Sequence, residues 1–177
     1  MLKHKTLLTP RTLFELVKDL KRAGKRIGFT HGAFDLFHYA HLDLLKKSAS
    51  ICDFLIVGVD SDESIASYKS YKKPIIEQRY RAKIINELDC VDAVFIKDIP
   101  LNSEAHVELY KDLLVDIVTI GTRFEEKFRD LIQSEAEEAG AKLIYIDTEQ
   151  DVSTTSIINN IIEKYSEGAF KYLRQEK

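Results

Sequence analysis

Apolar residues are grouped along this chain into short continuous runs and into longer segments with helical spacing. The short runs contain few polar residues, which is typical of strands that are buried on both faces of a sheet. The pattern therefore predicts five strands, at residues 26–30, 54–59, 93–96, 117–120 and 143–146.

The segments between these runs have apolar residues three or four positions apart, which indicates helices. The first is residues 12–23, with apolar Leu13, Leu16, Val17 and Leu20 and with Gly24 at its end. The other predicted helices cover residues 41–50, 77–88, 107–114, 124–139 and 153–165. Strands that alternate with helices form a parallel sheet. We therefore predict an α/β fold, a Rossmann-like, doubly wound, five-stranded parallel sheet with helices on both faces.

The length of 177 residues suits one domain with one buried core. We expect a single domain over residues 1–177. It would consist of a leading helix in residues 1–24, a catalytic core in residues 25–165 and a C-terminal tail in residues 166–177. Hydrophobic residues make up 45% and charged residues 31% of the chain, as in ordinary globular proteins.

The charge and the cysteines exclude several classes of protein. The chain has 26 Lys and Arg against 29 Asp and Glu, a net charge of −3, which argues against binding to nucleic acid. Cys52 and Cys90 have no metal-site spacing and are expected to be reduced thiols. No apolar run has the length of a membrane span or a signal peptide. We therefore expect a cytoplasmic protein without a membrane partner.

Three chemically unusual segments follow predicted strands, at residues 31–41, 60–73 and 147–155. Ligands of such sheets bind beyond the carboxyl ends of the strands, near the switch in strand order. The predicted fold therefore brings these three segments together.

His38 and His41 lie three residues apart at the predicted start of a helix, so both side chains can point the same way. Two imidazoles beside a helix N-terminus are suited to stabilise the charge that builds on an α-phosphate during nucleotidyl transfer. The alternatives are a pair of core histidines or two metal ligands. A zinc site would need a third protein ligand, and the sequence shows no obvious one.

The sequence GAFDLFHYAH at residues 32–41 resembles the GxFDxxHxGH signature of the cytidylyltransferase-like nucleotidyltransferases, also called the HxGH superfamily. The resemblance extends over residues 25–162. It implies an enzyme that transfers a nucleoside monophosphate from ATP or CTP to a small phosphorylated acceptor and releases pyrophosphate. It further implies Mg²⁺ carried by the triphosphate, no protein metal site, and a homodimer. Ala40 departs from the signature, which has glycine there.

A cationic segment, KSYKKP at residues 69–74, precedes Arg81. A solvated charged loop is one interpretation. The segment also resembles the K-x-x-x-[RK]-P loop and following arginine of nucleotide-sugar enzymes in this family. That resemblance assigns Lys69, Lys73 and Arg81 to phosphate contacts. Asp62 is either a helix cap or a functional residue.

Two more segments complete the resemblance. Ser153, Thr154 and Thr155 match the family's Ser-Thr-Thr motif, and they can cap a helix and hold the triphosphate at once. Gly121 and Arg123 lie where the family receives the base. Relatives usually have an acidic residue at the position of Arg123, so this arginine is either a base-site difference or a surface residue.

The resemblance assigns catalysis to His38, His41, Lys69 and Arg81. It assigns nucleotide binding to these histidines and to Thr30, His31, Gly32, Ala33, Phe34, Asp35, Lys73, Gly121, Arg123, Ser153, Thr154 and Thr155.

Two branches of the family compete for the substrate. The leading helix, the Lys69 and Lys73 spacing and the acidic Asp89 before Val91 favour a heptose-1-phosphate adenylyltransferase. The sequence GTRFEEKF at residues 121–128 is instead reminiscent of glycerol-3-phosphate cytidylyltransferases. A third interpretation, suggested by Ala40 and Arg123, is a nucleotide-binding regulatory protein with impaired catalysis.

Overall fold

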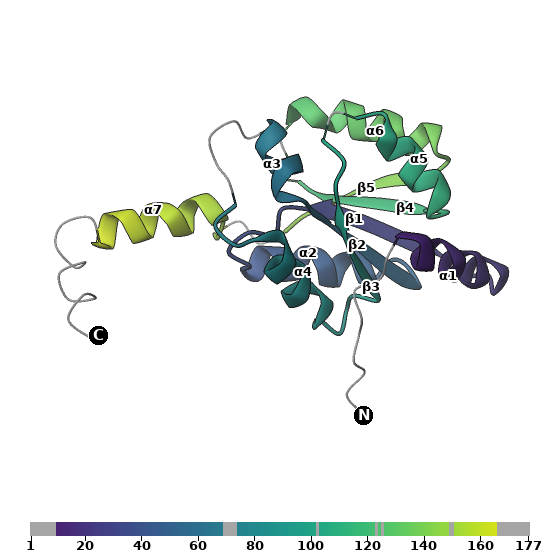
Figure 1. Ribbon diagram of the computed structural model, residues 1–177, viewed down its shortest axis with the longest axis horizontal. Helices are drawn as coiled ribbons and strands as arrows, with labels where there is room; N and C mark the ends of the chain where they lie inside the picture. Colours follow the sequence, from purple (N-terminus) through teal and green to yellow (C-terminus); the bar gives the residue numbers. More distant parts are fainter. Residues whose placement is uncertain are drawn as a thin grey trace.

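A computed structural model describes residues 10–68, 74–101, 103–122, 124, 126–148 and 151–165 of this chain. Its centre is one five-stranded sheet in the order β3-β2-β1-β4-β5, and all neighbouring strands run parallel (Figure 1). The strands are β1 (Ile27–Gly32), β2 (Phe54–Asp60), β3 (Ala93–Lys97), β4 (Ile117–Gly121) and β5 (Lys142–Ile146). The predicted strands and fold class are confirmed.

Helices cover both faces of the sheet, as the apolar pattern predicted. On one face, α2 (Tyr39–Ala49) and α4 (Gln78–Asn86) pack over a core that includes Leu45, Val57 and Ile85. On the other face lie α1 (Pro10–Arg22), α5 (Ala105–Asp112) and α6 (Arg129–Glu138). That core includes Leu13, Phe29, Tyr110 and Ile132. Burial of apolar side chains on both faces is what favours the sheet.

Two local elements differ from the prediction. A short helix that was not predicted, α3 (Asp62–Tyr68), follows β2, because seven residues are too few for a helical period to show. The predicted helix at residues 124–139 is instead a 3₁₀ turn, η1 (Glu126–Phe128), followed by α6. The side chain of Arg129 donates to the carbonyls of Phe124 and Thr122, which holds the chain in a turn before α6 begins.

The last helix, α7 (Thr154–Tyr165), extends away from the sheet (Figure 1). None of its residues is buried, and Ile161, Ile162 and Tyr165 are exposed. Within the described part of the chain, no helix has the length and apolar character needed to cross a membrane.

Strand order changes direction between β1 and β4, which are neighbours in the sheet. The chain leaves β1 for α2 on one face, and it leaves β4 for α6 on the other. The carboxyl ends of these two strands therefore form the crevice in which such folds bind ligands. Residues 33–38, which we call the histidine loop, follow β1 at this edge, and Thr122 follows β4.

Candidate active site

Two histidines lie against each other at the start of α2: His38 ends the loop after β1, and His41 lies in the first turn of the helix. Their rings stack with centroids 3.8 Å apart and an interplanar angle of 21°. His38 is the N-cap residue in extended backbone, and its carbonyl accepts from the backbone N–H groups of His41 and Leu42. The prediction that both side chains share one side of the helix start is confirmed. Positive potential at a helix N-terminus suits an anionic ligand there.

The backbone before this pair is strained. Phe34 and Leu36 have φ of +50° and +46°, a left-handed conformation that costs a side-chain-bearing residue about 1 kcal/mol or more. Phe34 is buried, and its ring lies edge-on to the ring of His41, with the ring centroids 5.4 Å apart. Such strain persists where surrounding contacts impose it, and it is common at functional sites.

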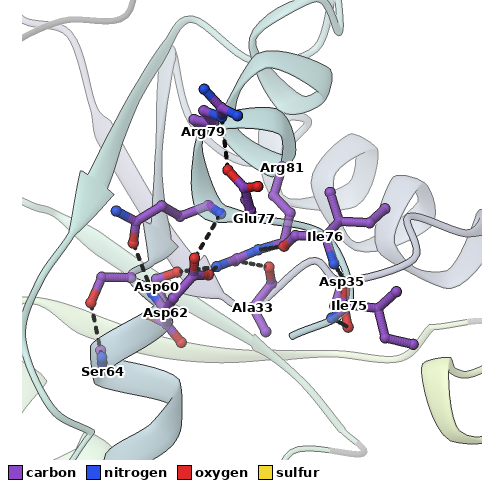
Figure 2. Close-up of polar contacts among 12 residues, drawn as sticks. Ala33, Asp35, Asp60, Asp62, Ser64, Ile75, Ile76, Glu77, Arg79 and Arg81 are labelled. Atoms are coloured by element: carbon purple, nitrogen blue, oxygen red, sulfur yellow. Dashed lines mark hydrogen bonds and ion pairs between the residues drawn. The ribbon is translucent and has the colours of Figure 1, made fainter. Parts of the chain in front are cut away.

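Asp35 supplies those contacts. One oxygen of its carboxylate accepts from Ile75 N–H at 2.9 Å, and the other accepts from the N–H groups of Ile76 and Leu36, both at 3.0 Å (Figure 2). Its backbone carbonyl accepts from the Thr154 hydroxyl at 2.8 Å. Asp35 therefore connects the histidine loop with the segment before α4 and with the start of α7.

The departure from the family signature at Ala40 is accommodated by the backbone. Ala40 is buried in the first turn of α2 and has ordinary helical backbone. A positive φ favours glycine, and this position does not have that conformation.

The start of α7 has the predicted cap. The hydroxyl of Ser153 accepts from Ser156 N–H at 3.0 Å, and the hydroxyl of Ser156 accepts from Ser153 N–H at 2.8 Å. Thr154 then reaches back to Asp35, while Thr155 is exposed. The N-terminus of α7 is thereby fixed beside the histidine loop, as the predicted convergence required.

Arg81 lies buried at the start of α4 and uses its guanidinium on protein oxygens (Figure 2). Its Nε donates to Ile76 O at 2.8 Å, and its Nη1 donates to Ala33 O. Its Nη2 donates to Asp60 O at 2.8 Å and pairs with Asp62 Oδ1 at 2.7 Å. These contacts join Ala33, in the loop after β1, to the end of β2 and to the segment before α4. The prediction that Arg81 contacts a phosphate directly stays a prediction.

Asp62 does not cap α3, because the hydroxyl of Ser61 accepts from Ser64 N–H at 2.9 Å and takes that role. The carboxylate of Asp62 instead pairs with Arg81 and accepts from Gln78 N–H at 3.3 Å. Asp62 therefore joins the end of β2 to the start of α4.

The loop after β4 is held by a residue that the sequence did not single out. Arg129 donates through Nε to Phe124 O at 3.2 Å and through Nη2 to Thr122 O. Thr122 Oγ1 in turn donates to Asp147 Oδ1 at 3.4 Å. A signal was available, because an arginine in the first turn of a helix opposes the helix dipole and implies another partner.

Thr30 and His31 have buried side chains on opposite faces of β1. The hydroxyl of Thr30 donates to Thr119 O at 2.8 Å, toward α2. His31 points to the α5 side, where burial and the charge of Lys97 lower its pKa to about 4 despite Asp60 nearby, so it is neutral at pH 7. Any contact of these two residues with a nucleotide would therefore come from their backbone.

Three predicted site residues, Lys69, Lys73 and Arg123, lie outside the described residues. Within the described ranges, no three His, Cys, Asp or Glu side chains are grouped so that they could hold a metal ion.

Comparison with known proteins identifies similar chains. Residues 29–160 match the family described as cytidylyltransferase-like. Bifunctional protein HldE of Desulfatibacillum aliphaticivorans is 37% identical over 145 residues, covering 82% of this chain and 29% of that protein. HldE of Syntrophotalea carbinolica is 34% identical over 162 residues, covering 89% of this chain and 31% of that protein. This chain thus spans about three tenths of the length of these curated relatives.

A solved structure is also similar. The lipopolysaccharide core biosynthesis protein from Thermoplasma volcanium GSS1 superposes with a TM-score of 0.58 and 26% sequence identity. The match covers 72% of this chain and 100% of that one.

Proposed function

This chain belongs to the cytidylyltransferase-like family of nucleotidyltransferases, and we propose that it transfers AMP from ATP to a sugar 1-phosphate, as a heptose-1-phosphate adenylyltransferase does. The observation that carries the proposal is the stacked pair of His38 and His41 at the N-terminus of α2, in a chain similar to HldE proteins.

The proposed reaction is one in-line displacement. An oxygen of the acceptor phosphate attacks the α-phosphorus, the bond between that phosphorus and the oxygen bridging to the β-phosphate breaks, and pyrophosphate leaves. The acceptor is already an anion, so no general base has to remove a proton. His38 and His41 donate hydrogen bonds to the α-phosphate oxygens, whose negative charge grows in the transition state.

The rest of the site binds and orients the triphosphate in this proposal. The N–H groups at the start of α7 and of the loop after β1 face its phosphates. Lys69 and Lys73 screen the anionic reactants. Mg²⁺ is carried by the triphosphate oxygens and neutralises part of their charge when bound. The nucleotide is the small-molecule partner, and the cytoplasm, where ATP is abundant, is the proposed location.

A glycerol-3-phosphate cytidylyltransferase that uses CTP is the second candidate. It is favoured by one feature, the sequence GTRFEEKF at residues 121–128, which includes Arg123. A nucleotide-binding regulatory protein without catalysis is the candidate of another class. It would bind a triphosphate and release no pyrophosphate.

A homodimer is also proposed, and the exposed apolar face of α7 supports it. This 12-residue helix has no buried residue, and so short a helix is marginal in water without packing. A second copy of the chain would cover Ile161 and Ile162. The mass in solution tests this, because Ile161→Glu with Ile162→Glu should convert a dimer into a monomer, whereas the exposed-site change Glu163→Gln should not.

Pyrophosphate release tests the reaction itself. The purified chain would be given ATP or CTP with Mg²⁺ and, in turn, a heptose 1-phosphate, glycerol 3-phosphate and other sugar phosphates. We expect release with ATP and a sugar 1-phosphate. Release with CTP and glycerol 3-phosphate alone would favour the second candidate. Triphosphate binding without release from any pair would favour the regulatory protein.

A further inference from the structure

Four titratable side chains are buried together beneath the carboxyl ends of β1, β2 and β3. They are His31 on β1, Asp60 on β2, Lys97 on β3 and His106 on α5, with exposed fractions of 4%, 2%, 1% and 0%. We call them the buried ionic layer. They lie on the α5 side of the sheet, near the end of β1 that leads toward His38 and His41.

Lys97 organises this layer. Its ammonium lies 2.7 Å from Ile99 O, 3.0 Å from Asp60 Oδ1 and 3.1 Å from His106 Nε2. An ammonium has three N–H donors and no acceptor, so Ile99 O and His106 Nε2 accept hydrogen bonds from it, and Asp60 forms an ion pair with it. His106 therefore carries its proton on Nδ1, which lies 3.4 Å from Glu135 Oε1. Lys97 thus specifies one tautomer of the buried His106.

Gly58 makes the space for this arrangement. A Cβ at Gly58 would lie 3.3 Å from the Cβ of both His31 and Lys97, and 3.1 Å from Cζ of Phe29. These distances are tighter than ordinary van der Waals contact. The two side chains can therefore flank β2 because the strand has a glycine between them.

Asp60 connects the layer to the loop after β1 at two points. Its Oδ1 lies 3.5 Å from His31 Nδ1, and its carbonyl accepts from Arg81, which also donates to Ala33 O (Figure 2). His31 and Ala33 flank Gly32, the last residue of β1. The His31 side chain thus contacts the Asp60 carboxylate, which pairs with Lys97, and Arg81 joins the carbonyls of Asp60 and Ala33.

The lowered pKa of Asp60 indicates that this residue is charged and forms an ion pair with Lys97. Burial raises the pKa of Asp60, but the contacts with His31 and the positive charge of Lys97 outweigh it and hold that pKa below its usual value. Asp60 is therefore a carboxylate at neutral pH. A buried ion pair is often no more stabilising than an apolar pair of similar size, because both charges lose their hydration. The stability of the fold alone therefore does not explain why a lysine and an aspartate are paired at this buried position.

We propose that Lys97 is a positioning residue for nucleotidyl transfer, which acts through Asp60 and Arg81 to fix the backbone of Gly32 and Ala33 beside the triphosphate. This inference rests on the proposed function. Lys97 touches no reactant. A shift of about 1 Å in groups that orient a substrate can cost about 100-fold in rate, which is the size of effect expected from releasing this backbone.

Two variants separate positioning from stability. Lys97→Met leaves Asp60 as a buried unpaired charge, so it should lower both the melting temperature and kcat. Lys97→Met combined with Asp60→Leu replaces the ion pair by an apolar pair, and it should recover most of the melting temperature while kcat stays about 100-fold low. Lys18→Met, at an exposed position of α1, is the matched control and should change neither.

A double variant that recovers kcat together with the melting temperature would overturn the positioning role. The ¹⁵N NMR shifts of His106 in the unaltered protein provide a readout that depends neither on activity nor on folding of a variant. We expect the Nδ1–H tautomer, and an Nε2–H tautomer would overturn the arrangement from which the inference starts. If the unaltered protein released no pyrophosphate from any pair, the proposed function would fail, while the tautomer would still report on the layer.

Discussion

The hydroxyl of Thr154 donates to the backbone carbonyl of Asp35 at 2.8 Å, across 119 residues of sequence. This bond joins the start of α7 to the loop after β1, which leads into the stacked His38 and His41. Asp35 also accepts from the backbone of Ile75 and Ile76 with its carboxylate. Asp35 therefore links the loop after β1 to the start of α7, and these are the two segments whose N–H groups are proposed to bind the phosphates.

Thr154→Val should weaken binding of the triphosphate with little loss of stability. The change keeps the shape of the side chain and removes one hydrogen bond, worth about 1 kcal/mol. We expect KM for ATP to rise about fivefold and the melting temperature to change little. Lys18→Met, at an exposed position of α1, serves as the control. An unchanged KM would show that this bond does not position α7.

Arg81→Lys should destabilise the protein and slow the reaction. A lysine cannot reach the carbonyls of Ile76, Ala33 and Asp60 at once, because it lacks the planar fork of the guanidinium. We expect a loss of about 2–4 kcal/mol in the free energy of unfolding. The neighbouring Arg79→Lys, which alters an exposed pair with Glu77 and a contact over the Tyr80 ring, should be nearly neutral.

The same variant tests the direct phosphate contact that the sequence predicts for Arg81. If Arg81→Lys kept full stability and raised only KM for the substrates, the arginine would act on the phosphates and not on the loop. Chemical denaturation and steady-state kinetics on one preparation distinguish the two outcomes.

Gly58→Ala should destabilise the protein because the added methyl meets His31, Lys97 and Phe29. These neighbours are backbone-proximal carbons or a packed ring, so overpacking of about 1–3 kcal/mol is expected in the free energy of unfolding. Gly24→Ala is a useful comparison, since a Cβ there meets nothing and only its positive φ opposes the change. A Gly58→Ala protein as stable as the unaltered one would contradict the close packing around the buried ionic layer.

Stability should fall as the pH is lowered from about 6.5 toward 4. His31 has its pKa lowered to about 4 in the folded protein, against 6.5 for the ordinary side chain. Between these values the unfolded chain binds a proton that the folded chain does not, so the free energy of unfolding rises with pH. The shift corresponds to about 3 kcal/mol.

Denaturation at several pH values checks this expectation. His31→Asn removes the titrating group, so the variant should lose less stability over the same pH range. Equal pH dependence in both proteins would show that His31 is not the group responsible.

Much of the fold could be predicted from the sequence because its signals are local. The apolar runs of the strands and the Ser153 cap each depend on adjacent residues, and both are confirmed. α3 was missed because its seven residues are too short for a period, and the break before α6 depends on contacts made by Arg129.

The buried ionic layer could not be predicted from the sequence. His31, Asp60, Lys97 and His106 come from four separate elements, and each alone resembles an ordinary surface or site residue. They meet because strand order places β1, β2 and β3 side by side, with these side chains on one face. His31 was assigned to the nucleotide from its place in the motif, whereas burial of its ring depends on the packing of α5.

The most direct test of the central claim is pyrophosphate release from ATP and a sugar 1-phosphate by the unaltered protein and by His41→Ala. If His38 and His41 stabilise the charge on the α-phosphate, the variant should keep its melting temperature and lose about 100-fold to 1,000-fold in kcat. A His41→Ala protein that releases pyrophosphate as fast as the unaltered one would contradict the account.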